Sequence, residues 1–122
     1  MVTPVFLISD YPAALAFYID WLGFRIDWEE EPDRNRIYIQ ISRGAFMLHL
    51  SNSPADSSPG SVVRLEIHGL PAYHRYLLSK ADLPTQPPIL GPAYWNSQVL
   101  EMLVTDPSGN RIIFCEPAAL KT

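Results

Sequence analysis

The stretch ALAFYIDWLGF at residues 14–24 predicts a helix that runs directly into a strand. Gly23 supplies the left-handed conformation that ends many helices. Much later in the chain, the pentapeptide DPSGN at residues 106–110 is typical of a tight turn between two strands. One face of the predicted helix is apolar at helical spacing and is expected to be buried: Ala14, Phe17, Tyr18 and Trp21.

Outward from these two stretches, the same order of elements is predicted twice. Strands at 3–9, 24–29, 37–41 and 46–50 surround a helix that Asp10 caps. After a polar linker come strands at 61–67, 98–105 and 111–115, a helix opening at 69–71, and a proline-rich connection at 84–92 with at most a short edge strand. We therefore predict an α+β fold of two tandem βαβββ modules within a single domain spanning residues 1–122. Module one covers about 1–52, the linker 53–60 and module two about 61–122.

Composition narrows the class of protein. The chain has 122 residues, 48% of them apolar and 18% charged, which is ordinary for a soluble globular domain. A net charge of −4 argues against a nucleic-acid partner, and no apolar run approaches the roughly 18 residues of a membrane span. The single cysteine, Cys115, lies in an apolar run and is interpreted as a core residue, as expected in a reducing compartment. We predict a cytoplasmic protein without membrane association.

The negative charge is local, because six of the thirteen carboxylates lie between Asp20 and Asp33. Two interpretations remain open. The run is a solvated acidic loop, or it is an electrostatic rim that attracts a cationic ligand. Glu30 lies in the middle of this run and serves as its representative.

The order and spacing of several short motifs resemble the vicinal oxygen chelate superfamily, and most of all its bleomycin resistance branch. The superfamily also includes glyoxalase I and dioxygenases. The resemblance implies half-open sheets that curl around a cleft, and a homodimer that exchanges an N-terminal arm and builds each of its two clefts from both chains. The arm would hinge at Pro4. The motifs that carry the resemblance are Pro4–Val5 ahead of Ser9–Asp10, Phe17–Tyr18, Leu22–Gly23–Phe24, Asp27–Trp28–Glu29 and residues 106–110.

Enzymes of this superfamily hold a divalent metal with His, Gln or Glu at four positions. Those positions map here to Thr3, Leu48, Val62 and Ile113. Since the three aliphatic side chains have no lone pair to donate, we predict a metal-free protein without a cofactor and without catalytic residues. The alternative is a metal-dependent lyase or dioxygenase, in which a register shift turns His49 inward together with Glu66, His68 or Glu116.

Without a metal, the cleft is left for binding. Strand alternation turns Tyr38 and Gln40, with Arg64 and Glu66, away from the helices. Aromatic side chains would add flat surfaces, unless they pack in the core or a dimer interface. We predict sequestration of a bleomycin-type antibiotic or a similar flat cationic molecule, with a sensor or accessory binding module as the second alternative. The predicted ligand-binding residues are Trp28, Glu30, Tyr38, Gln40, Arg64, Glu66, Tyr94 and Trp95.

Overall fold

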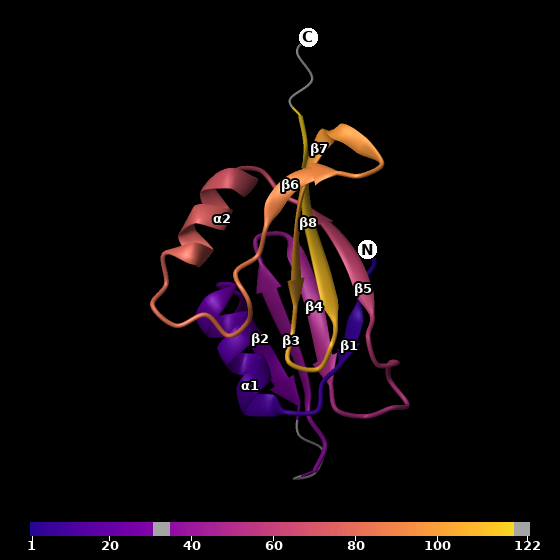
Figure 1. Cartoon of the computed structure of the whole chain (residues 1–122). Coiled ribbons are helices and arrows are strands. Elements are labelled where there is room, and N and C mark those ends of the chain that lie inside the picture. The colour runs from indigo at the N-terminus through magenta and orange to yellow at the C-terminus, as the bar shows by residue number, and fades with distance from the viewer. Residues whose placement is uncertain (31–34, 119–122) are drawn as a thin grey trace.

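The computed structural model describes residues 1–30 and 35–118, which form two four-stranded sheets and three short helical segments (Figure 1). The order of strand, helix and three strands occurs twice, as predicted. Along the chain the elements are β1 (Val5–Leu7), α1 (Tyr11–Leu15), the π-helix η1 (Ala16–Trp21), β2 (Arg25–Glu30), β3 (Tyr38–Arg43), β4 (Phe46–Ser51), β5 (Val62–Glu66), α2 (Leu70–Leu78), β6 (Leu90–Ala93), β7 (Asn96–Thr105) and β8 (Arg111–Pro117).

The first helix begins and ends where the sequence predicts. Asp10 Oδ1 accepts a hydrogen bond from the Ala13 amide at 3.0 Å, which satisfies one free amide of the first turn. The helix then continues as η1, a π-helical segment that the sequence pattern does not predict. Gly23 follows it with a φ of 87°. Within the described ranges no helix is long and apolar enough to cross a membrane.

The two sheets share one topology. The strand order is β1-β4-β3-β2 in the first sheet, called sheet A here, and β5-β8-β7-β6 in the second, called sheet B. In both sheets the first and last strands of the module pair in parallel, and the other pairs are antiparallel. This repetition confirms the predicted tandem βαβββ architecture.

Each sheet has one face in the core and one open face. Helices α1 and α2 lie on the same side of the molecule in Figure 1, and β1 and β5 lie on the other. Alternate residues of the central strands are almost wholly buried, so each sheet contributes one face to a shared core. Their neighbours along each strand point to the open face. The buried apolar residues of β3, β4 and β8 are Ile39, Ile41, Leu48, Leu50, Ile112 and Phe114.

The turn at 106–110 joins the two modules as well as reversing the chain. Within it the Gly109 amide donates to the Asp106 carbonyl at 3.0 Å. Across the modules, Asn110 Nδ2 donates to the Leu7 carbonyl at 2.7 Å, and the Ser9 amide donates to Ser108 Oγ at 3.0 Å. The turn therefore fixes β1 against module two.

The prediction that Cys115 belongs to the core is wrong. Ile112 and Phe114 occupy the core, so Cys115 points to the open face of sheet B, where it pairs with Glu66 across the strands. It is half-buried, and burial raises the pKa of its thiol. The apolar run in β8 places side chains on both faces of the sheet, since Ile113 is also on the open face. An apolar run therefore does not show on which face the cysteine lies.

Candidate functional site

The open face of sheet A carries a cluster of three rings. Trp28 stacks on Tyr38 with centroids 6.1 Å apart and planes only 11° from parallel. The His49 imidazole contacts both rings at steep angles, at 5.3 Å from Trp28 and 5.1 Å from Tyr38. Trp28 remains 40% exposed. One side of the aromatic pair is therefore available for a flat ligand to stack on.

A β-bulge brings a carboxylate to the same face. The pairing of β2 with β3 shifts between Ile26 and Trp28, so Asp27 and Trp28, although consecutive, both turn to the open side. Asp27 accepts hydrogen bonds from Gln40 Nε2 at 3.1 Å and from the Ser42 hydroxyl at 3.0 Å, and it forms an ion pair with the exposed Arg25, whose Nε lies 3.1 Å away. These bonds hold the pKa of Asp27 below its usual range, so the carboxylate is charged next to the aromatic pair.

Sheet B has a second cluster on its open face. The Arg64 guanidinium lies over the Trp95 ring, 5.3 Å from its centroid, and forms an ion pair with Glu101. The hydrogen bond that Arg64 donates to Glu101 raises the pKa of Arg64. Trp95 is 54% exposed, and the Cys115 thiol lies beside Arg64. Two of the predicted ligand-binding residues, Arg64 and Trp95, are thus brought together.

The other predicted residues are less closely placed. Glu30 is exposed at the end of β2 opposite Tyr38, while Glu31 and Asp33 of the acidic run fall outside the described residues. Tyr94 is 99% exposed at the tip of the β6–β7 hairpin and belongs to neither cluster. Glu66 lies on the open face of β5 and lines a cavity of about 800 Å³ near the end of β8.

The predicted metal positions need one correction. Leu48 is fully buried in the core, so the position assigned to it on the open face belongs to His49, one residue later. Val62 is exposed on the open face and Ile113 is half-buried there, and neither can bind a metal. Among residues 1–30 and 35–118, no group of three or more His, Cys, Asp or Glu side chains could hold a metal ion.

Glu116, a member of the alternative metal set, is engaged elsewhere. Its two carboxylate oxygens accept hydrogen bonds from the amides of Gly69 and Leu70, at 2.7 and 3.0 Å. The carboxylate therefore caps the N-terminus of α2, where the helix dipole favours negative charge. His68, another member of that alternative set, is exposed, and Glu116 supplies the cap.

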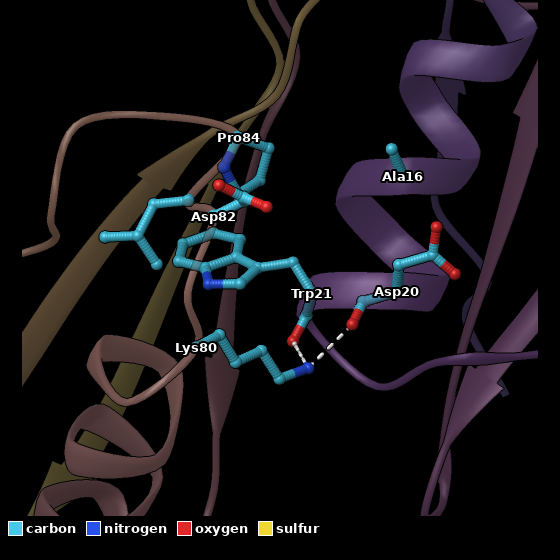
Figure 2. A pocket seen from close by; sticks show the side chains of 7 residues that line it. Ala16, Asp20, Trp21, Lys80, Asp82 and Pro84 are labelled. Carbon is cyan, nitrogen blue, oxygen red and sulfur yellow. Dashed lines mark hydrogen bonds between the residues drawn. The ribbon is translucent and has the colours of Figure 1, made fainter.

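A separate cavity of about 280 Å³ lies between η1 and the loop after α2 (Figure 2). In Figure 2 the Lys80 ammonium reaches across to the backbone carbonyls of Asp20 and Trp21, both at 2.7 Å. These carbonyls end η1, so the lysine neutralises the negative end of that helix. The cavity shares no lining residue with the two ring clusters, and we assign it a structural role.

The sequence profile described as "Glyoxalase superfamily protein" matches residues 1–120. The chain belongs to the glyoxalase superfamily. None of the curated proteins matches it by sequence.

Solved structures of other proteins share the fold. A bleomycin-binding protein from Streptomyces verticillus, solved with copper(II)-bleomycin, is 26% identical with a TM-score of 0.66, over 97% of this chain and 94% of that one. Another bleomycin-binding protein, solved with bleomycin, is 22% identical with a TM-score of 0.69, over 95% and 97%. An antibiotic-binding protein from Streptomyces sp. CB03234 is 17% identical with a TM-score of 0.69, over 95% and 93%.

In this glyoxalase superfamily member, the clusters on the two open faces include three residues that the sequence analysis did not predict as ligand-binding residues. His49 was considered only as a shifted metal ligand, although alternation from Leu50 and Leu48 would have placed it on the open face. Glu101 lies opposite Cys115 in β7 and could have been found by the same count. Asp27 could not, because a bulge is needed to turn it outward.

Proposed function

We propose that the chain is a non-catalytic protein that sequesters a flat cationic small molecule of the bleomycin type. The observation that carries the proposal is the stacked pair of Trp28 and Tyr38, with the Asp27 carboxylate and its exposed partner Arg25 on the same face. A ligand such as bleomycin has a flat bithiazole that can stack on the rings and a positive tail that a carboxylate attracts. The bleomycin-binding relatives support the choice of ligand class.

The proposed binding cleft is shared between two chains. Each sheet of one chain has a single open face, and that of sheet B exposes aliphatic side chains, with Val62 at 44% and Leu103 at 45%. Exposed apolar patches of this kind favour an interaction surface. In the proposed homodimer, the open face of sheet A in one chain faces that of sheet B in its partner. Trp28 and Trp95 would then lie on opposite walls of each cleft.

Among the described residues, the groups on the two open faces do not suggest bond-making chemistry. The Arg64 guanidinium is paired with Glu101, and raised pKa values of Cys115 and Tyr38 keep both groups protonated and poor nucleophiles. A single histidine supplies at most one metal ligand, where such metals need three or more. These features favour binding over catalysis. This geometry suits a cytoplasmic resistance protein and a small-molecule sensor equally well. Tight binding of an unrelated metabolite, in place of the antibiotic, would favour the sensor.

The test is isothermal titration of metal-free bleomycin into purified protein, with metal analysis of the same sample. We expect about one drug per chain and no stoichiometric metal. Absence of binding would overturn the antibiotic as ligand. Stoichiometric bound metal would instead favour a metal-dependent lyase or dioxygenase.

A further inference from the structure

His49 is held in a hydrogen-bond chain that fixes its protonation state. Gln40 Nε2 donates to Asp27, an acceptor only, so Gln40 Oε1 is the atom that faces His49. His49 Nε2 must then carry the proton that Oε1 accepts, at 3.0 Å. The unprotonated Nδ1 accepts a hydrogen bond from the Tyr38 hydroxyl at 2.7 Å. The chain of donors thus assigns a neutral imidazole protonated on Nε2.

The same imidazole holds the aromatic pair. It contacts Trp28 and Tyr38 side-on, and it bonds to Tyr38 through the hydroxyl. Removing that bond would free the Tyr38 ring on which Trp28 stacks. Because the rings are the proposed ligand platform, the state of His49 sets the platform.

A protonated His49 has no carboxylate partner among the described residues that pack against it. Its neighbour on β1 is Val5. On the other side, its neighbours are the Trp28 ring of β2 and the Tyr38 ring and Gln40 amide of β3. Asp27 is bonded to Gln40 and Ser42 and forms an ion pair with Arg25, and Asp56 is bonded to Ser51 and Arg36. Burial therefore lowers the pKa of His49, and no neighbouring carboxylate among the described residues raises it.

We infer that His49 is a positioning residue for the ligand, and that its protonation releases a flat cationic molecule from the Trp28–Tyr38 pair. In the neutral ring Nδ1 accepts from the Tyr38 hydroxyl; after protonation Nδ1 can only donate, so the direction of that hydrogen bond reverses. The added positive charge lies next to the site of a cationic ligand and repels it. The ligand and the proton then exclude each other. The inference rests on the proposed function, because it concerns the same site.

The direction of the pH dependence follows from the pKa. The pKa of His49 lies below its ordinary value of 6.5, so the imidazole is neutral at neutral pH and the ligand binds with its full affinity. The affinity decreases as the pH falls through that lowered pKa. Exclusion by one proton weakens binding by up to about tenfold for each pH unit below it.

The experiment measures the Kd of metal-free bleomycin from about pH 5 to about pH 8 by titration calorimetry, the range in which a histidine titrates. It compares wild type with His49→Gln and with the exposed control His68→Gln. The readout is the change of Kd with pH within each protein, so a weaker neutral-pH Kd of His49→Gln, which loses the imidazole between the two rings, does not affect the comparison. The acid-side loss should disappear in His49→Gln and persist in His68→Gln. Any pH dependence of the drug itself is common to all three proteins.

Tyr38→Phe provides a second variant that keeps the stacked ring. It removes the hydroxyl that stabilises the neutral imidazole, so it should raise the pKa of His49 and move the loss of affinity to higher pH. Imidazole NMR of the ligand-free protein should show the proton on Nε2. A wild-type Kd that does not change with pH, or a His49→Gln protein that keeps the wild-type slope, would overturn this inference alone. Absence of binding at every pH would overturn the proposed function and this inference with it.

Discussion

The Tyr18 hydroxyl donates a hydrogen bond to Asp106 Oδ2 at 2.7 Å, and the bond is buried although its partners lie 88 positions apart in different modules. Asp106 also accepts from the amides of Ser108 and Asn110, both at 2.8 Å, and from Asn110 Nδ2 at 3.0 Å. A buried carboxylate is therefore fully hydrogen-bonded, and one of its donors comes from the other module. The two modules are joined by polar contacts as well as by the shared core.

Replacing Tyr18 with Phe should destabilise the protein by about 1–2 kcal/mol, because Asp106 loses a buried hydroxyl donor. Equilibrium urea unfolding at fixed protein concentration measures the loss, with Tyr76→Phe on the surface of α2 as the control. Burial, with the neighbouring Asp106, raises the pKa of Tyr18 above its ordinary value of 10.0. Wild type should therefore lose stability above about pH 10, where the unfolded phenol ionises, and Tyr18→Phe should lose less. Equal stability of Tyr18→Phe and wild type at neutral pH would contradict the role of this bond.

The sequence predicted the elements and the open faces where alternation was regular. Tyr38 and Gln40 share a face as expected, since β3 is regular and the buried Ile39 and Ile41 mark its other face. Prediction failed where position was counted from distant motifs, as with Leu48, because such counting does not fix register to a single residue. It also failed at Asp27, whose orientation depends on a bulge, a feature of the strand pair and not of one strand.

Replacing Trp28 with Ala should weaken the binding of bleomycin by about 1–3 kcal/mol if the ring stacks on the ligand. Trp95→Ala tests the opposite wall of the proposed cleft, and a similar loss is expected there. Tyr76→Ala is the matched control, because Tyr76 is an exposed aromatic on α2 that belongs to neither cluster. Calorimetry measures the Kd of each. If Trp95→Ala binds like wild type, sheet B does not supply a wall of the cleft.

Replacing Leu103 with Glu should convert the proposed dimer to monomers, because it places a charge in the exposed apolar part of sheet B. Light scattering with size-exclusion chromatography measures the mass. Leu78→Glu makes the same change at a residue of similar exposure on α2 and should remain dimeric. The monomer should also lose affinity for bleomycin, since each cleft would lack a wall. A wild-type protein that is monomeric, or a monomeric variant that binds bleomycin normally, would contradict the proposal that two chains share each cleft.

Replacing Glu30 with Lys should slow ligand association severalfold at low salt and leave dissociation nearly unchanged, since an exposed rim charge acts on encounter more than on the bound state. Stopped-flow fluorescence of the exposed tryptophans gives both rates. Added salt should reduce the difference from wild type, because the attraction between exposed charges is screened. Asp82→Lys makes the same change of charge at an exposed position near Lys80, away from both open faces, and controls for net charge. If Glu30→Lys and Asp82→Lys slow association equally, the effect comes from the charge of the whole protein. If neither slows it, the acidic run is a solvated loop that does not steer the ligand.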